Sequence, residues 1–342
     1  MNRKTLIVKL GSIGDVAMVL PAAWKLHQAG SEIDWLCGRT VAPLLSCYSW
    51  VRPIVVDDKR LLGGHRAGAI LEVFRTWRTL LGSSYDLCAV LHYDRRYRVL
   101  TLPVRSLRSI TLHWSQRAFK LVSERQHSAE YVRILCGLPD ENRTENIPPL
   151  APDLLPGNPL LRGNKTRIAI VPGGARNIFR NDPQRRWPLD SYVELAKLLL
   201  DKGYEVVLTG GPGDEWVEPK FASLPVQNRI GQWAIPETLA FYDSCDCVVT
   251  HDTGPLHLAG LTRCALVALF GPTPPSNFLP RRNGVVGLWG GERLPCRPCF
   301  DGREYADCKL NKCMISIEPD QVVETIDGLL QIQSTEWQIK NV

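Results

Sequence analysis

Three loops of this sequence place glycine and charged residues directly after an apolar, strand-like segment. The first loop spans residues 11–15 (Gly-Ser-Ile-Gly-Asp) and follows the apolar segment 5–10. Glycines let a backbone turn tightly and approach a ligand closely, and ligands of open α/β sheets bind beyond the strand ends. Asp15 has two interpretations, as an acid that stabilises a helix start or as a carboxylate that takes a proton.

The second loop, residues 171–176, turns at Gly173 and Gly174 and precedes a basic cluster, Arg-Arg-Trp-Pro, that begins at Arg185. Backbone amides at a helix threshold and a guanidinium fork both suit a phosphate group. This loop therefore predicts an anion site.

The third loop, residues 251–257 (His-Asp-Thr-Gly-Pro-Leu-His), leads from an apolar strand into a short helix. The amides of Thr253 and Gly254 at that helix start favour a diphosphate, and Asp252 can accept hydrogen bonds from sugar hydroxyls. His257, one turn later, is either a packed residue or a ligand contact.

A dinucleotide-binding site is the obvious alternative, and the residues disfavour it. The first loop lacks the complete G-x-G-x-x-G pattern. Asp34 falls within the second predicted strand, whereas an acid that binds ribose belongs at the strand end.

The cysteines form two groups. Several lie scattered in apolar segments, where free thiols pack as small hydrophobes. Four others are close in sequence and follow the spacing C-x2-C-x8-C-x4-C: Cys296, Cys299, Cys308 and Cys313. We interpret these four as ligands of a structural zinc ion, with packed reduced thiols as the alternative.

The elements that must position these residues alternate between strand-like and helical patterns. Such alternation predicts parallel sheets covered by helices. The predicted strands are 5–10, 33–37, 54–56, 87–91, 167–171, 205–208, 247–250 and 265–270, and the predicted helices are 16–29, 67–81, 189–201, 236–244, 255–261 and 319–333. Prolines interrupt the pattern near its middle, so we predict domains at 1–150 and 165–342, joined by a linker at 151–164.

Charge is distributed unevenly between the two halves. Residues 1–150 hold 21 Lys and Arg against 13 Asp and Glu, whereas the remainder holds 20 against 22. A basic first domain favours an anionic partner, although an arginine-rich solvated face is the alternative. No apolar run approaches the ~18 residues of a membrane helix, and we expect a first strand instead of a signal peptide, hence a cytoplasmic protein.

Taken together, the three motifs resemble glycosyltransferase family 9, the ADP-heptose:lipopolysaccharide heptosyltransferases. Residues 11–15 resemble the family's S-x-G-D loop, residues 185–188 its K-R-W-P element, and residues 252–257 its D-[ST]-G-x-x-H motif. The resemblance implies a GT-B fold with two Rossmann-like domains facing each other across a cleft. It also implies a donor bound mainly by the second domain, an acceptor bound by the first, inversion at the anomeric carbon and no required metal.

On this resemblance the expected function is transfer of a heptose from ADP-heptose to the inner core of lipopolysaccharide or a related anionic glycolipid. Asp15 is the expected base, and Gly11, Ser12 and Gly14 form the acceptor-side loop. The expected donor-binding residues are Gly173, Gly174, Arg185, Asp252, Thr253, Gly254 and His257. No cofactor is expected for catalysis, and the sequence contains no Asp-x-Asp metal motif.

Arg185 departs from the family, because lysine is usual at this position. Arginine keeps the charge and adds bidentate phosphate geometry. The expected partners are a nucleotide sugar and the glycolipid, with peripheral contact to the inner face of the cytoplasmic membrane and no nucleic acid. The alternatives are a GT-B transferase with another nucleotide sugar or acceptor, and a catalytically silent nucleotide-sugar-binding protein.

Overall fold

The computed structural model describes residues 3–63, 66–94, 96–112, 126–138, 147–176, 181–300 and 305–340, with side chains to residue 332. The chain divides into two compact units. The first comprises Met1–Val122, His127–Asn142 and Asn146–Leu154, and the second comprises Ser123–Gln126, Arg143–Glu145 and Leu155–Val342. The main division therefore falls within the predicted linker, most of which belongs to the second unit.

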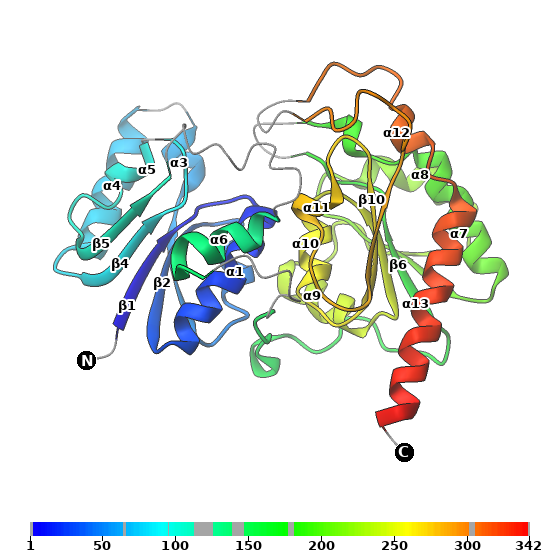
Figure 1. The fold of residues 1–342 in the computed structure, drawn as a ribbon, viewed down its shortest axis with the longest axis horizontal. Coiled ribbons are helices and arrows are strands. Elements are labelled where there is room, and N and C mark those ends of the chain that lie inside the picture. Colours follow the sequence, from blue (N-terminus) through cyan, green and yellow to red (C-terminus); the bar gives the residue numbers. More distant parts are fainter. Residues whose placement is uncertain are drawn as a thin grey trace. The chain divides into compact units, whose positions relative to one another are not determined.

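The first unit is a parallel sheet of five strands in the order β3-β2-β1-β4-β5. Its strands are β1 (Arg3–Val8), β2 (Ser31–Gly38), β3 (Val51–Val56), β4 (Ser84–Val90) and β5 (Arg105–Thr111). Its helices are α1 (Ile13–Gln28), α2 (Ala42–Leu45), α3 (Asp58–Leu62), α4 (Arg66–Leu80), α5 (Arg96–Val99), α6 (His127–Cys136) and the 3₁₀ turn η2 (Pro152–Leu154). Figure 1 shows these elements in blue to green.

Helices cover both faces of the first sheet. Leu6 and Val8 of β1 pack into one apolar cluster with Leu80 of α4, while Ile7 between them is buried outside that cluster. Successive strand side chains point to opposite faces, so β1 needs apolar residues at every position. Helix α1 packs on β2 and on α6.

The second unit repeats this plan with six parallel strands in the order β11-β10-β9-β6-β7-β8. Its strands are β6 (Arg167–Val171), β7 (Glu205–Leu208), β8 (Gln227–Asn228), β9 (Cys247–His251), β10 (Ala265–Phe270) and β11 (Val285–Trp289). Its helices are η3 (Pro183–Arg185), α7 (Leu189–Asp201), η4 (Glu215–Val217), α8 (Glu218–Phe221), α9 (Ile235–Ser244), α10 (Gly254–Gly260), α11 (Pro275–Phe278), α12 (Lys312–Ile315) and α13 (Pro319–Lys340).

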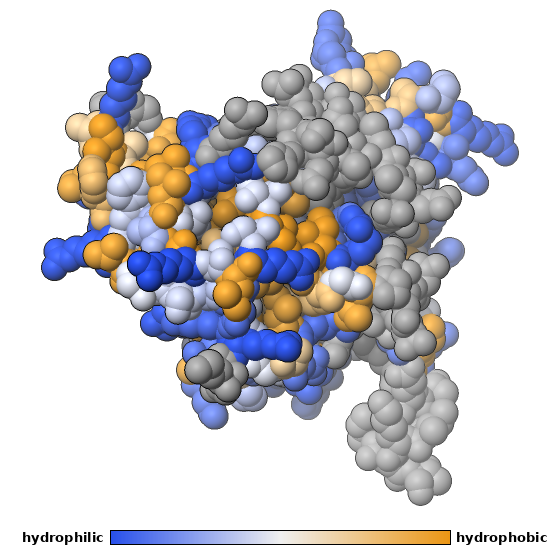
Figure 2. Space-filling view, turned by 60° about the vertical axis from the view of Figure 1, so that its left-hand side comes forward, coloured by the Kyte–Doolittle hydropathy of each residue, from blue (hydrophilic) through white to orange (hydrophobic). Residues whose placement is uncertain are grey.

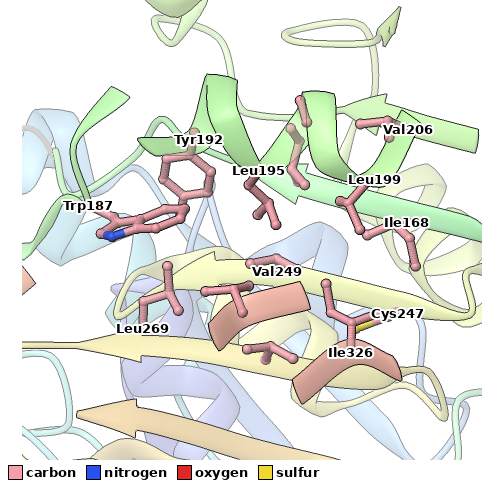
Figure 3. Close-up of a cluster of buried hydrophobic side chains, with 14 of the residues drawn as sticks. Ile168, Trp187, Tyr192, Leu195, Leu199, Val206, Cys247, Val249, Leu269 and Ile326 are labelled. Atoms are coloured by element: carbon pink, nitrogen blue, oxygen red, sulfur yellow. The ribbon is translucent and has the colours of Figure 1, made fainter. Parts of the chain in front are cut away.

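An apolar core lies between one face of the second sheet and helices that include α7 and α13. Figure 3 shows Tyr192, Leu195 and Leu199 of α7 pointing toward the strand side chains, with Ile326 of α13 in the same cluster. Trp187 is almost completely buried at its edge, and its indole N–H donates to the carbonyl of Ile317 at 3.0 Å. The tryptophan of the basic cluster is therefore a core residue.

Every strand and helix predicted from the sequence is present, and the fold class is confirmed as α/β with two doubly wound units. The sequence missed strands β5, β8 and β11, the ten-residue helix α6, and the helices of four or five residues (α2, α3, α5, α8, α11 and α12). Strand β5 lies at the sheet edge and carries exposed polar residues, so it lacks the apolar run of a central strand. Helix α6 is short and stands outside the simple alternation.

The surface also carries apolar side chains. Figure 2 shows orange hydrophobic groups gathered among blue hydrophilic ones on the face in view. Among the described residues, no helix has both the length and the apolar character needed to cross a membrane.

Candidate functional site

Each unit has one of the predicted glycine loops at the point where its strand order reverses: residues 11–15 in the first unit and residues 171–176 in the second. In the first sheet this point is between β1 and β4, and in the second it is between β6 and β9. Connections leave such a pair of strands in opposite directions, which opens a crevice at the carboxyl ends where ligands bind. The loops after β1 and β6, and Asp252 after β9, therefore occupy the ligand-binding edges of their own sheets.

Asp15 sits at the start of α1, at the reversal point of the first sheet. Its Oδ2 accepts hydrogen bonds from the backbone N–H and the hydroxyl of Ser12, at 3.1 and 3.2 Å. Its Oδ1 lies 3.3 Å from Nζ of Lys9, and the side chain is 41% exposed. The capping interpretation and the base interpretation are thus compatible, because the carboxylate caps α1 and still faces solvent.

Lys9 keeps Asp15 ionised. Burial works to raise the pKa of Asp15, but the charge of Lys9 and the N–H of Ser12 outweigh it, so the pKa lies below its usual value. Burial likewise opposes the charge on Lys9, yet Asp15 and Tyr131 hold the pKa of Lys9 above its usual value. The carboxylate is therefore available as a proton acceptor at neutral pH.

Three neighbours of Asp15 were not predicted from the sequence. Lys9 directly follows β1, and its ammonium also donates to the carbonyl of Leu91 at 3.2 Å. His92, after β4, accepts from the N–H of Leu10 at 2.9 Å. Burial, together with the charge of Lys9, lowers the pKa of His92 well below its usual value, so this imidazole is neutral. Tyr131 comes from α6, the helix that the sequence did not indicate.

A cavity of about 460 Å³ lies at the carboxyl ends of β2 and β3 in the same unit. Arg39, Lys59 and Arg60 contribute positive charge to its wall, and Asp57 pairs with Arg39 at 3.1 Å and with Arg60 at 3.4 Å. Asp15 is not among the lining residues of this cavity. Its three cations make it a candidate site for an anionic group.

Asp34 lies within β2, as the sequence predicts, and not at the strand end where an acid that binds ribose belongs. The residue is buried within β2, where its carboxylate accepts from Nε of Arg52 at 2.6 Å and from the hydroxyl of Tyr85 at 2.7 Å. It is a structural acid, distant in the strand from the carboxyl end.

In the second unit, Arg185 and Asp252 come together as a buried ion pair. Nη2 of Arg185 lies 3.2 Å from Oδ1 of Asp252, and the other carboxylate oxygen accepts from the hydroxyl of Thr273 at 2.7 Å. Asp252 is almost completely buried, and the Arg185 side chain is 21% exposed. Nε of Arg185 makes no hydrogen bond within the described part of the chain, whereas Oδ1 of Asp252 has only the guanidinium as its partner there.

The free Nε donor makes this pair a candidate ligand site. A buried polar group without a partner costs roughly 1–3 kcal/mol, so a ligand that accepted from Nε of Arg185 would be favoured. A phosphate oxygen matches the guanidinium, and a sugar hydroxyl matches the carboxylate. Burial works to raise the pKa of Asp252, but Arg185, His257 and Thr273 outweigh it and the pKa is lowered.

The structure gives a second reason why residues 173 and 174 are glycines, besides the predicted close approach of a ligand. The N–H of Gly174 donates to Oδ1 of Asp214 at 2.7 Å, and a side chain at Gly173 would collide with the same carboxylate. Gly174 also has a φ of +85°, which favours glycine. Asp214, which the sequence did not indicate, therefore accepts a hydrogen bond from one of the amides that we expected to bind a phosphate.

The remaining predicted donor residues lie on α10. Thr253 is the N-cap of this helix, so the amides of Thr253 and Gly254 are at its start, as predicted. His257 is buried, and its charge contributes to the low pKa of Asp252. Burial, with Arg185 and Arg186, lowers the pKa of neighbouring His251 to about 3, so that residue is a neutral core histidine.

The four clustered cysteines range from exposed (Cys296) to buried (Cys313), and all four are free thiols. Burial, together with the Cys308 and Cys296 thiols, raises the pKa of Cys299. Cys308 Sγ accepts from the N–H of Asn311 at 3.3 Å. Within the described ranges, no three His, Cys, Asp or Glu residues are arranged to hold a metal ion. The zinc site therefore stays a prediction from the sequence.

Comparisons with known proteins agree with this geometry. The sequence model of glycosyltransferase family 9 (heptosyltransferase) matches residues 155–309. The chain is 30% identical over 179 residues to lipooligosaccharide heptosyltransferase 2 of Haemophilus influenzae, covering 50% of this chain and 49% of that protein. The matched part thus spans about half the length of this curated relative.

Two solved structures share the fold over nearly the whole chain. A family 9 glycosyl transferase from Veillonella parvula has a TM-score of 0.76 at 19% identity, covering 97% of this chain and 99% of that one. The E. coli heptosyltransferase WaaC with ADP has a TM-score of 0.71 at 16% identity, covering 95% and 99%. The predicted resemblance to family 9 is confirmed, and so is the fold class.

The contact between Lys9 and Asp15 yields a prediction about pH. Replacement of Lys9 by methionine removes the charge that lowers the pKa of Asp15, while burial continues to raise it. We expect the pKa of Asp15 to rise above its usual value in Lys9→Met, which NMR titration of labelled aspartate carboxyls measures, with Asp15→Asn identifying the signal. Lys25→Met, on the last turn of α1, is the matched control. An unchanged titration in Lys9→Met would disprove the coupling.

Proposed function

We propose that this chain, whose residues 155–309 match glycosyltransferase family 9, transfers a heptose from ADP-heptose to the inner core of lipopolysaccharide or a related anionic glycolipid. The observation that carries the proposal is the Asp15–Lys9 pair of the first unit together with the Arg185–Asp252 pair of the second. One pair supplies an ionised carboxylate, and the other supplies a cation for phosphate and an acceptor for sugar hydroxyls.

The proposed reaction is a single displacement. A hydroxyl oxygen of the acceptor bonds to the anomeric carbon of the donor, while the bond from that carbon to the diphosphate oxygen breaks. Asp15 takes the hydroxyl proton, and ADP departs with the bonding electron pair. Attack opposite the leaving group inverts the anomeric configuration.

The leaving diphosphate needs positive charge, which the proposal assigns to Arg185 and the amides of Thr253 and Gly254. Arg185 is held by Asp252 and remains charged at any working pH, since its pKa is raised: burial opposes the charge, but Asp252 outweighs it. With this charge supplied by the protein, the proposal contains no catalytic metal ion. A solved structural neighbour carries ADP, which supports an adenine nucleotide as the donor's leaving group.

An anionic acceptor fits the charge of the first unit. Residues 1–150 carry a net +8, from 21 basic and 13 acidic residues. Arg39, Lys59 and Arg60 concentrate part of this charge at the carboxyl edge that also holds Asp15. The proposal places the protein in the cytoplasm, in peripheral contact with the membrane, because its donor is water-soluble and its acceptor is a lipid.

Two alternatives remain distinguishable by experiment. A GT-B transferase for another donor or acceptor would bind a different member of a panel of nucleotide sugars. A silent binding protein would bind one but release no nucleoside diphosphate. The presence of Asp15 at the carboxyl edge of the first sheet favours an enzyme, because proton removal from the acceptor needs a carboxylate.

A structural metal ion in the four-cysteine segment is also part of the proposal. Four thiolates suit zinc or iron, and the N–H of Asn311 already donates to Cys308 Sγ, as it would to a thiolate. Metal binding would have to draw the four sulfur atoms closer together than they now lie. The segment packs on the loop after β10, where the N–H of Cys299 donates to the carbonyl of Pro272. Its role would be to fix the loop that carries Thr273.

Replacement of Asp15 by asparagine tests the base. Asparagine at this third helical position can still accept from the N–H of Ser12, but it leaves the buried Lys9 ammonium without its anion, so thermal stability should fall. Donor affinity should stay near wild type, because the proposal assigns the donor to the second unit. General-base assistance is worth about 10² to 10⁴ in rate, so turnover should fall by at least about a hundredfold. Steady-state kinetics, thermal unfolding and donor titration measure the three quantities, with exposed Asp190→Asn as control. Retention of more than about a tenth of turnover would falsify the assignment.

Replacement of Arg185 by alanine tests the phosphate contact. A hydrogen bond to a charged group is worth about 1.5–3 kcal/mol, so KM for the donor should rise roughly ten- to a hundredfold. The contact exists in the ground state too, so kcat at saturating donor should change less. Arg185→Lys should be intermediate, and Arg263→Ala, which is 89% exposed, should match wild type. If KM for the donor does not change, Arg185 does not bind the phosphate.

Metal analysis tests the cysteine segment. Protein purified without chelator should contain zinc or iron near one equivalent, because four thiolates form a complete tetrahedral ligand set. Cys308→Ser should lower the content, while Cys136→Ser, which replaces a half-buried thiol of the first unit, should leave it unchanged. If the wild-type protein contains neither zinc nor iron near one equivalent, the metal site is ruled out.

A further inference from the structure

Helix α4 and Leu81, which directly follows it, turn an apolar stripe toward solvent. Ile70, Phe74 and Leu81 are 57%, 58% and 74% exposed, and Leu71 beside them is 62% exposed. With Trp77 they follow steps of four, three and four residues (70, 74, 77, 81), which align on one side of a helix. We call Ile70, Leu71, Phe74, Trp77 and Leu81 the α4 face.

The opposite side of α4 is buried and partly polar. Glu72 and Thr76 are almost completely buried there, next to Leu80. The Glu72 carboxylate accepts from the N–H of Asp57 at 2.8 Å, and the Thr76 hydroxyl donates to the carbonyl of Glu72 at 2.8 Å. The helix is therefore inverted relative to an ordinary surface helix, whose apolar stripe packs on the core. Folding of the first unit does not account for the α4 face.

Arginines flank the α4 face. Arg66, Arg75 and Arg78 are exposed on the same helix, and its one acidic residue, Glu72, is the buried one. Strand β5, at the sheet edge, adds exposed Arg105 and Arg108 and has no acidic residue. A helix with a bulky apolar face and basic neighbours is typical of proteins that lie in the headgroup region of a bilayer.

Trp77 anchors the face at one point. Its indole N–H donates to the carbonyl of Val99 in α5 at 2.6 Å, and its ring meets that of Phe74 edge-on, with 5.4 Å between centroids. Tryptophan with one polar contact and an apolar body is enriched where membrane meets water. Figure 1 shows α4 beside α5 and β5 within the first unit.

We propose that the α4 face docks the protein on a bilayer that contains anionic lipids. The apolar side chains enter the headgroup boundary, and Arg66, Arg75 and Arg78 bind the lipid phosphates. The choice of a bilayer agrees with the proposed function, which supplies a lipid acceptor, whereas the docking surface stands on its own observations. A second copy of the chain fits less well, because a two-fold contact would place the same arginines against each other.

The test measures binding to vesicles of phosphatidylethanolamine and phosphatidylglycerol, and to vesicles of phosphatidylcholine alone, by co-sedimentation without any nucleotide sugar. Wild type should bind the anionic vesicles, and added salt should weaken binding because it screens the arginines. Ile70→Ser with Phe74→Ser removes apolar contact, and Arg75→Gln with Arg78→Gln removes charge. Each double variant should lower the partition coefficient by at least about tenfold.

Matched controls lie on exposed positions of the second unit. Leu161→Ser, at a leucine that is 90% exposed, and Lys197→Gln, at a half-exposed lysine of α7, should bind vesicles like wild type. Thermal unfolding and light scattering accompany each variant. The proposal would be overturned if the wild-type protein did not bind anionic vesicles or if the α4 variants bound them like wild type. It would also be overturned if the α4 variants only converted a dimer to a monomer. Loss of sugar transfer with intact vesicle binding would instead count against the proposed function.

Discussion

A charged side chain buried against an opposite charge stands at the centre of each candidate site. Lys9 holds Asp15 ionised in the first unit, and Arg185 holds Asp252 ionised in the second. Burying either charge alone would cost several kcal/mol, so each pair must be kept together by its surroundings. The carbonyl of Leu91 and the hydroxyl of Thr273 provide that support. The Asp15 and Asp252 carboxylates are thereby held next to their cations at the edges of mostly apolar units.

Parallel strands explain why these pairs form at sheet edges. A strand of a doubly wound sheet is covered on both faces, so polar groups within it need a partner, as Asp34 of β2 has in Arg52, and they are accommodated more easily where the strand ends. Lys9 directly follows β1 and Asp252 directly follows β9. Support from other segments is then needed, and Asp214 illustrates it by fixing the glycine turn after β6 through the N–H of Gly174. The loop after β6 is thus held by a residue from the loop after β7.

The first unit combines two kinds of surface that a lipid acceptor would require. Its carboxyl edge gathers Arg39, Lys59 and Arg60 around a cavity, and α4 presents an apolar face with flanking arginines. Both surfaces carry basic side chains, which suit an anionic partner. The second unit is nearly neutral by comparison, and its helix α7 turns its apolar side chains into the core.

The sequence alone determined the alternation of strands and helices, the glycine loops and the candidate residues Asp15, Arg185 and Asp252. These features are local, because residue periodicity and turn chemistry act over a few neighbours. Tertiary structure decided strand order, and strand order brought His92 and Lys9 together and Thr273 against Asp252. It also decided which side of α4 faces out, since a helix period fixes the stripe but not the surface on which the helix packs.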